Sequence, residues 1–255
     1  MRLADLEDAE LAARLAAEAG RLLLEVRAGS GLTGKGLGTA GDAAANRFLV
    51  DALREARPED GLLSEEEQDN PARLAKRRVW IVDPVDGTRE YAEGRTDWAV
   101  HVALAVDGVA ALGAVALPGL DGGLVLRSDR PQPLGAMAYR PRFVVSRTRP
   151  PEEAEAVAAA LGGELIAMGS AGAKAMAVVR GEAEAYLHAG GQYEWDNCAP
   201  VAVAAAHGLH CSRIDGSAFV YNNRDTYVPD LLICRSEWAA PVLAEVQRLA
   251  GQGAG

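Results

Sequence analysis

The stretch that decides the fold of this chain is Trp80-Ile81-Val82-Asp83-Pro84-Val85-Asp86-Gly87-Thr88. Its first residues are apolar and rich in β-branched side chains, which predicts a buried strand that ends at Asp83. The Asp, Pro and Gly residues that follow are typical of a turn. Asp83 and Asp86 lie three residues apart across this turn, so both carboxylates can converge on one point. If a helical turn begins next, the amides of Gly87 and Thr88 face the same cavity, an arrangement that suits a divalent cation and a phosphate.

Other interpretations of this stretch stay open at this point. Asp-Pro and Asp-Gly pairs are also common in plain turns, so the stretch alone fits a structural loop equally well. A nucleophilic Asp followed two residues later by an acidic Asp would indicate a phosphatase with a covalent aspartyl-phosphate. Here the spacing is three residues and includes Pro84, which disfavours that mechanism.

Length and composition predict a cytoplasmic, soluble protein. The 255 residues are enough for one large domain or for two halves with an extended sheet, and 49% of them are apolar. No apolar run is long enough to span a bilayer, and Met1–Glu10 leads into an acidic amphipathic segment rather than a leader. Three widely spaced cysteines in apolar surroundings fit reduced core thiols: Cys198, Cys211 and Cys234.

The net charge of −10 argues against nucleic acids and anionic membranes as partners, because both require an excess of Lys and Arg. Phosphorylated small molecules remain compatible with an acidic protein. Clustered carboxylates can hold Mg²⁺, and the charge of the ion inverts the local field.

The pattern of residues 1–133 predicts two helices followed by an antiparallel meander. Apolar spacing indicates a first helix from Asp5 to about Val26, and Gly29–Gly38, which contains Lys35, has the composition of a mobile loop. The second helix is expected to begin after Thr39–Asp42, with Asp42 as a cap rather than as a carboxylate behind the site. The remaining expected features are the acidic trio Glu65–Glu67, a hairpin over 98–117 that turns at 107–108, and a strand at 124–126.

Residues 134–255 predict an alternating α/β half that follows a joint at Pro131 and Pro133. Strands are expected at 143–145, 164–168, 184–187 and 231–234. Helices are expected from Pro151 to about 162, from 169–174 onward, over 197–207 and over 236–249. Asp196 is expected to head the third of these helices, with Pro200 in its first turn because proline fits only there.

Four carboxylates are predicted to lie at the ends of elements: Glu65, Asp83, Asp86 and Asp196. Carboxylates gathered in this way can form a two-metal centre for phosphoryl hydrolysis, with the metals roughly 3.5–4 Å apart.

Three segments together resemble the motifs of the inositol monophosphatase superfamily of lithium-sensitive, Mg²⁺-dependent phosphatases. These are Ser64-Glu65-Glu66, the stretch from Trp80 to Tyr91, and Glu194-Trp195-Asp196. The resemblance covers nearly the whole chain and implies a layered αβαβα sandwich and a homodimer. The segments 169–174 and 188–196 are most similar to the CysQ-type branch, whose members act on 3′-phosphoadenosine 5′-phosphate.

The resemblance also implies roles for individual residues. One Mg²⁺ would be held by Glu65, Asp83 and the carbonyl of Val85, a second by Asp83, Asp86 and Asp196, and a third would draw on Glu65 again. The implied catalytic residues, which include those that orient a water nucleophile, are Glu65, Thr88 and Asp86. The implied substrate contacts are Asp86, Gly87, Thr88, Arg89, Ser170, Lys174, Tyr193 and Asp196.

Two departures from family patterns bear on the substrate. Inositol-specific members carry a Glu seven residues before the final Asp, where this chain has Ala189, which disfavours inositol phosphates. Nucleotidase relatives carry Ser-Arg-Ser-His where this chain has the segment 146–149, so the candidates for adenine contact are Arg147, Arg149, His188 and Tyr193. The expected reaction is removal of the 3′-phosphate from 3′-phosphoadenosine 5′-phosphate, giving AMP, and from its sulfated form.

The alternatives are an inositol monophosphatase or fructose-1,6-bisphosphatase activity at the same metal site. A non-catalytic nucleotide-binding module is disfavoured, because such a protein is expected to have lost at least one of the motif residues and none is lost here.

Overall fold

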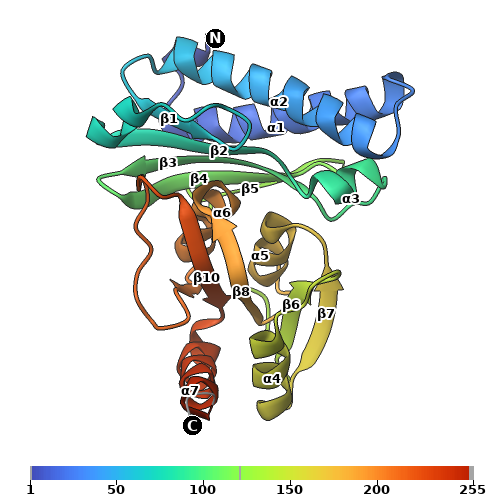
Figure 1. The fold of residues 1–255 in the computed structure, drawn as a ribbon, viewed down its shortest axis with the longest axis vertical. Helices are drawn as coiled ribbons and strands as arrows, with labels where there is room; N and C mark the ends of the chain where they lie inside the picture. Colours follow the sequence, from blue (N-terminus) through green and yellow to red (C-terminus); the bar gives the residue numbers. More distant parts are fainter. Residues whose placement is uncertain (1, 121, 253–255) are drawn as a thin grey trace.

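The structure is a computed structural model that describes residues 2–120 and 122–252. It contains two five-stranded sheets in a layered arrangement with helices (Figure 1). The helices are η1 Leu3–Asp5, α1 Asp8–Gly29, α2 Gly34–Ala56, η2 Pro71–Ala75, α3 Thr88–Ala92, α4 Glu152–Ala160, α5 Ala171–Val179, α6 Glu194–Ala206 and α7 Ser236–Gln252. The strands are β1 Gly61–Ser64, β2 Arg78–Asp86, β3 Ala99–Val106, β4 Val109–Leu117, β5 Leu124–Arg127, β6 Arg142–Ser146, β7 Glu164–Met168, β8 Ala185–Tyr193, β9 His210–Ser212 and β10 Tyr227–Cys234.

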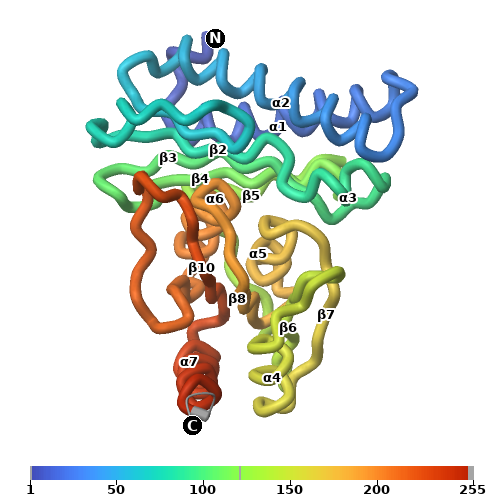
Figure 2. Tube along the Cα trace, in the orientation of Figure 1, coloured from blue at the N-terminus to red at the C-terminus, as the bar shows by residue number. Residues whose placement is uncertain are grey.

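The layers follow the predicted αβαβα order. Helices α1 and α2 cover one face of the first sheet, α6 packs on its other face beside α5, and the second sheet is followed by α4 and α7. The pair α1 and α2 and the helix α7 lie at opposite ends of the molecule (Figure 2). The prediction of a layered α/β fold is therefore confirmed.

The first sheet has the order β1-β2-β3-β4-β5, with β1 parallel to β2 and the other neighbours antiparallel. The predicted hairpin and meander are thus confirmed. The pairing of β2 with β3 is irregular between Asp83 and Asp86, and β2 continues to Asp86. The prediction that this strand ends at Asp83 was wrong, because a register shift, rather than a break in the strand, brings both carboxylates to its end.

The second sheet has the order β7-β6-β8-β10-β9. Strand β6 is parallel to β7 and β8, and β10 is antiparallel to β8 and β9. The chain passes from the first sheet to the second between β5 and β6, in the segment that contains Pro131 and Pro133. Each expected strand of this half is present, and β8 extends beyond its predicted end to Tyr193.

The glycine-rich segment before α2 differs from the expectation of a loop over Gly29–Gly38. Helix α2 begins at Gly34, so much of this segment is helical. A Cβ on Gly38 would lie 2.7 Å from Cγ2 of Thr88, and one on Gly41 would lie 2.6 Å from Cε1 of Tyr91. Glycine is needed here because α2 packs directly against α3, although the same composition is typical of a loop.

The start of α6 also differs from its prediction. The helix begins at Glu194, so Asp196 lies within its first turn and Pro200 lies inside the helix, beyond that turn. A proline at this position cannot donate to the carbonyl of Asp196.

No helix among residues 2–120 and 122–252 is long and apolar enough to cross a membrane. The three cysteines are free thiols, and Cys198 and Cys234 are buried as predicted, while Cys211 is half-buried.

Candidate active site between the two sheets

Three carboxylates converge between the first sheet and α6. Asp83 and Asp86 lie at the end of β2, Asp196 lies in the first turn of α6, and each offers an oxygen within 4.8 Å of the others. We call Asp83, Asp86 and Asp196 the acidic cluster. The parallel pairing of β1 with β2 brings Glu65, the residue after β1, to the same end of the sheet.

Asp83 has the environment expected of a cation ligand. Its side chain is 1% exposed, and Oδ1 accepts a hydrogen bond from the amide of Val85 at 3.0 Å. Among the described residues, Oδ2 is buried without a hydrogen-bond partner. Burial, together with the charges of Glu65, Asp86 and Asp196, raises the pKa of Asp83 well above its usual range. A buried, unpaired oxygen among other acids is costly unless a cation joins it, so the donor set fits a hard divalent metal ion.

Asp86 is held by groups from both halves of the chain. Its carboxylate accepts the amides of Ala171, at 3.1 Å, and Gly172, and Nε2 of His101 lies 3.2 Å from Oδ2. Burial alone would raise the pKa of Asp86, but His101, the Gly172 amide and Lys174 together outweigh it and lower the pKa. This carboxylate is therefore ionised and fixed in direction.

Glu65 and Asp196 are crowded by like charges. Loss of hydration and the charge of Asp196 raise the pKa of Glu65 to about 7. Burial and the charge of Asp86 raise the pKa of Asp196 to about 6, and its Oδ2 accepts the amide of Tyr193 at 2.6 Å. The structure thus brings three of the four predicted carboxylates within 4.8 Å of one another, in an acidic cluster that could hold a metal ion, and Glu65 lies beside this cluster at the end of β1.

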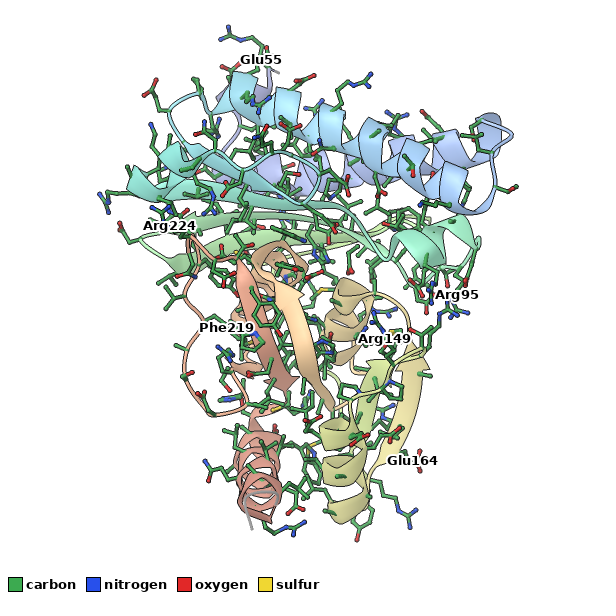
Figure 3. The ribbon with its side chains drawn as sticks, viewed as in Figure 1. Glu55, Arg95, Arg149, Glu164, Phe219 and Arg224 are labelled. Atoms are coloured by element: carbon green, nitrogen blue, oxygen red, sulfur yellow. The ribbon has the colours of Figure 1, made fainter. Side chains whose placement is uncertain are left out.

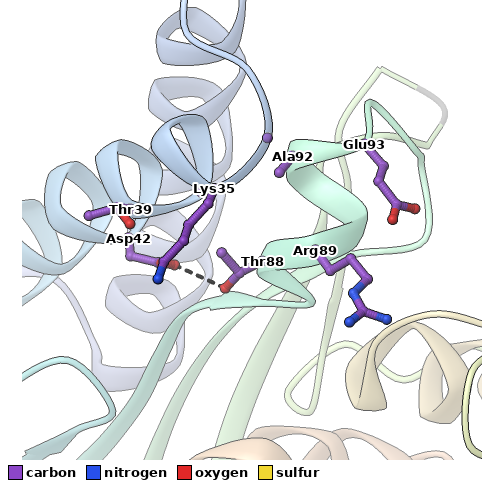
Figure 4. Close-up of a pocket in the computed structure, with 9 residues that line it drawn as sticks. Lys35, Thr39, Asp42, Thr88, Arg89, Ala92 and Glu93 are labelled. Carbon is purple, nitrogen blue, oxygen red and sulfur yellow. Dashed lines mark hydrogen bonds between the residues drawn. The ribbon is translucent and has the colours of Figure 1, made fainter.

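The hydroxyl of Thr88 lies near two oxygens, one of Asp42 and one of Val85, and Figure 4 shows its contact with Asp42. Its Oγ1 lies 3.2 Å from Oδ1 of Asp42 and 3.1 Å from the carbonyl oxygen of Val85, and its single proton can be donated to only one of them at a time. Burial, together with the charge of Glu66, raises the pKa of Asp42 to about 6. Asp42 lies in the interior of α2, so its prediction as a helix cap was wrong, because the helix begins earlier than expected.

Two hollows adjoin Thr88. One, of about 560 Å³, lies between the first turns of α2 and α3 and includes Lys35, Asp42, Thr88 and Arg89. The other, of about 620 Å³, lies between the two halves. We call the second hollow the inter-sheet cleft, and its lining residues are Gly87, Thr88, Arg89, Glu90, Ser146, Arg147, Thr148, Arg149 and Gly169.

The arginines of the inter-sheet cleft are not equivalent. Arg147 is bound to Glu90 at 2.8 Å and to Glu93 at 2.6 Å, so its charge is already paired. The guanidinium groups of Arg89 and Arg149 form no ion pair with the described part of the chain. Arg149 lies after the end of β6, on the side that faces α3 (Figure 3). The cleft therefore offers two cationic groups beside the turn that contains Gly87.

Ser170 and Lys174 lie beside the site, but their polar groups are used within the protein. Oγ of Ser170 caps α5 by accepting the amide of Ala173 at 3.0 Å. Nζ of Lys174 donates to the carbonyls of Gly169 and, at 2.9 Å, Ser170. Burial lowers the pKa of Lys174 to about 8. In this structure Lys174 stabilises the turn that directs the amides of α5 at Asp86.

Tyr193 provides an aromatic surface next to Asp196. Its ring is 46% exposed, stacks on Trp195 with centroids 4.9 Å apart, and meets the edge of Tyr227 at 6.0 Å. This surface suits a flat ring such as a nucleobase.

Sequence reasoning missed two residues of the site, Asp42 and His101. His101 is fully buried, and its Nδ1 lies 3.0 Å from the carbonyl oxygen of Trp195, so it connects Asp86 with the residue before Asp196. The sequence signal was a single polar residue in the apolar strand β3, at the position that pairs with Asp83. For Asp42 no local signal distinguishes a site carboxylate from a cap.

Comparisons with known proteins identify the family of this chain. The model of the inositol monophosphatase family matches residues 5–250. A curated protein of Mycobacterium leprae named 3′-phosphoadenosine 5′-phosphate phosphatase is 49% identical over 259 residues, covering 96% of this chain and 95% of that protein. One of the same name from Mycobacterium tuberculosis is 51% identical over 236 residues, covering 89% and 88%.

The fold also resembles a solved structure, that of CysQ from Bacteroides thetaiotaomicron, described as a bacterial member of the inositol monophosphatase family. Its TM-score is 0.77 at 25% identity, with 89% of this chain and 97% of that chain covered. Because the family model spans almost the entire sequence and the relatives match over most of their length, this chain belongs to the inositol monophosphatase family.

Proposed function

We propose that the protein is a Mg²⁺-dependent phosphatase that hydrolyses the 3′-phosphate of 3′-phosphoadenosine 5′-phosphate to give AMP. The observation that carries this proposal is the inter-sheet cleft, which has the turn at Gly87 and Thr88 at one end and the unpaired Arg89 and Arg149 beside it. A substrate with two phosphates can place one against the turn and the other against the arginines. The names of the mycobacterial relatives support the same substrate.

The metal site is proposed as follows. Glu65, Asp83 and the carbonyl of Val85 would hold one Mg²⁺. Asp83, Asp86 and Asp196 would hold a second, and Glu65 would be available to a third. When bound, Mg²⁺ polarises the phosphate and lowers the pKa of the attacking water. The unpaired Oδ2 of Asp83 supports this assignment, because it is the buried acceptor that most needs a cation.

The chain's own groups orient the reactants. In this proposal the hydroxyl group of Thr88 donates its hydrogen bond to Asp42. The lone pairs of the Thr88 oxygen are then free to accept a hydrogen bond from water. Glu65 would orient the attacking water together with Thr88, because both lie beside the acidic cluster. The amides of Gly87 and Thr88 donate to phosphate oxygens. Because α3 has five residues, these individual amides matter more than a helix dipole.

The adenosine is proposed to lie between Arg149 and the aromatic surface at Tyr193, with 3′-phosphoadenosine 5′-phosphosulfate as a second substrate. Ser170 and Lys174 contribute by holding the cleft wall. A homodimer and a role in cytoplasmic sulfur metabolism belong to the same proposal. The free, mainly buried cysteines fit a reducing compartment.

Parallel kinetics with three substrates test this function. Phosphate release with Mg²⁺ is measured from 3′-phosphoadenosine 5′-phosphate, inositol 1-phosphate and fructose 1,6-bisphosphate. We expect kcat/KM for the nucleotide to exceed the others by about 100-fold, or about 2.7 kcal/mol of transition-state stabilisation. Inhibition by millimolar Li⁺ is expected as well. Equal rates on all three would contradict the proposed specificity, and no release from any would contradict the phosphatase.

A further inference from the structure

Asn222 and Asn223, in the loop between β9 and β10, form hydrogen bonds with residues from both halves of the chain. From the second half, Glu194 accepts the amide of Asn222 at 2.7 Å, the amide of Asn223 at 2.8 Å and the side-chain amide of Asn223 at 2.9 Å. The side chain of Glu194 therefore has both oxygens occupied by this loop.

From the first half, Arg73 of η2 holds the same two residues. It donates to Oδ1 of Asn222 at 2.8 Å and to the carbonyl of Asn223 at 2.9 Å, and the side-chain amide of Asn222 donates back to its carbonyl at 3.1 Å. Asp69 binds the remaining guanidinium edge at 2.6 and 2.9 Å. We call Arg73, Asn222, Asn223 and Glu194 the clasp.

The clasp is built from groups that are costly to bury alone. The side chain of Arg73 is 1% exposed and Glu194 is 0% exposed. A buried charge is tolerated only when it is paired and hydrogen-bonded. The charge of Arg73 is paired with Asp69 and also hydrogen-bonded to the two asparagines, whereas Glu194 is satisfied by the two asparagines. Asn222 also adopts a left-handed backbone with φ of 65°, which is uncommon for a residue other than glycine.

The two charged residues of the clasp lie in the segments of the chain that carry proposed metal ligands. Arg73 lies in the segment between Glu65 and β2, and Glu194 lies two residues before Asp196 in the first turn of α6. This loop of the second sheet reaches the first sheet, where the amide of Tyr221 donates to the carbonyl of Gly108, between β3 and β4, at 2.9 Å. The clasp thus connects the segment that carries Glu65 to the helix that carries Asp196.

This connection opposes a repulsion within the site. Glu65 and Asp196 come from different halves, and both carboxylates lie at the end of the first sheet where Asp83 and Asp86 also lie. Without a metal ion, repulsion favours separation of these carboxylates. A rigid link between their segments lowers the cost of bringing them together when the ion binds.

We infer that the clasp holds Glu65 and Asp196 in the relative position that metal binding requires, which makes Arg73 and Glu194 positioning residues of the site. This inference rests on the metal-dependent function proposed above. It assigns a role to Arg73 and to the two asparagines, none of which belongs to the acidic cluster.

The test compares Glu194→Gln with Glu184→Gln. Glu184 is a matched control, because it is 1% exposed and also accepts two backbone amides, of Ala138 at 3.0 Å and Arg142 at 2.9 Å. Mg²⁺ binding to the metal-free full-length protein is measured by calorimetry, together with the Mg²⁺-induced rise in Tm. We expect Glu194→Gln to weaken Mg²⁺ binding about 10- to 100-fold, as is usual when a group behind a ligand is removed. Glu184→Gln should lower Tm without changing Mg²⁺ affinity.

The milder variant Asn223→Ala keeps the test decisive if Glu194→Gln fails to fold, and it should weaken Mg²⁺ binding to a smaller extent. The value of kcat at saturating Mg²⁺ should stay near wild type in the folded variants. Wild-type Mg²⁺ affinity in Glu194→Gln or Asn223→Ala, with only a lower Tm, would overturn the inference and leave the proposed function intact. Failure of the wild-type protein to bind Mg²⁺ would overturn both.

Discussion

The irregular end of β2, over residues 83–87, forms one turn of the site, and the segment before α5 forms another that contacts it. The two turns use their polar groups differently. In the first, Oδ2 of Asp83 is buried and unpaired among the described residues, so it is available to a ligand. In the second, Ser170 and Lys174 satisfy the backbone of their own turn, whose amides in turn fix Asp86. One turn is arranged to bind a metal and the other to keep its shape. From this difference we expect the reaction chemistry to depend on the end of β2 together with Asp196, and substrate choice to depend on the cleft wall of the second half.

The largest effect is expected from Asp83→Asn. The variant loses the carboxylate shared by both proposed metal sites, so kcat should fall at least ~10³-fold, more than is usual for loss of one oxyanion donor. The loss should be equal for nucleotide and sugar phosphates, since it affects the chemistry and not the cleft wall. Asp97→Asn, which removes a carboxylate that binds the amide of Gly169, is the control from the other turn. A near-normal rate in Asp83→Asn would contradict the metal assignment.

The next largest effect tests whether Asp42, in the first half, assists the reaction through the hydroxyl group of Thr88. Asp42→Asn removes the charged acceptor of the Thr88 hydroxyl, so kcat should fall about 10²-fold, with KM little changed. Asp51→Asn, at an exposed position of the same helix, is the matched control and should behave like wild type. If the two variants have equal rates, the contact between Asp42 and Thr88 only supports the packing of α2 on α3.

Asp83 and Asp42 also show what the sequence could and could not predict. The turn at Asp83 was predictable because its geometry is local: an Asx-type bond to Val85, a glycine with φ of 87° and a helix start at Thr88. The place of Asp42 was not predictable, because the start of α2 depends on the contact of this helix with α3 rather than on the glycine-rich composition of the helix itself.

The residues proposed to contact the substrate were harder to predict from the sequence, for a related reason. The prediction that Lys174 contacts a second phosphate rests on its type and position, but its orientation depends on burial behind the turn at Gly169, which no local pattern reveals. His101 escaped notice because only the register of β3 against β2 places it beside Asp86. Residues whose partners are distant in sequence are therefore the ones that required the structure.

A smaller, substrate-dependent effect is expected from the second half. Arg149→Ala should lower kcat/KM for 3′-phosphoadenosine 5′-phosphate about tenfold, the value of one charge-assisted hydrogen bond. It should leave the rate with inositol 1-phosphate unchanged, because this substrate has no second phosphate. Arg140→Ala, at an exposed position outside the cleft lining, is the control. An equal loss on both substrates would place Arg149 with the reaction chemistry and remove the distinction between the two sides.

The smallest effect concerns how the free energy of unfolding of the metal-free protein depends on pH. This dependence distinguishes an acidic cluster that requires a bound cation from one whose charges are already neutralised by the protein. The pKa values of Glu65, about 7, and Asp196, about 6, lie above those of the unfolded chain. Between about pH 5 and pH 7 the folded protein therefore retains protons that the unfolded chain has released, so the free energy of unfolding should decrease as pH rises. Asp42 acts in the same direction, and Lys174, with a pKa of about 8, contributes only above this window.

Melting temperatures in EDTA should accordingly fall from pH 5 to pH 7, and saturating Mg²⁺ should remove this slope, because bound metal keeps the carboxylates ionised and offsets their repulsion. Asp196→Asn should flatten the EDTA curve, since one of the crowded acids is lost. A Tm in EDTA that rises across the window would mean that the second half already neutralises the cluster. In that case the two turns would differ in position only, and the unpaired oxygen of Asp83 would no longer indicate a metal site.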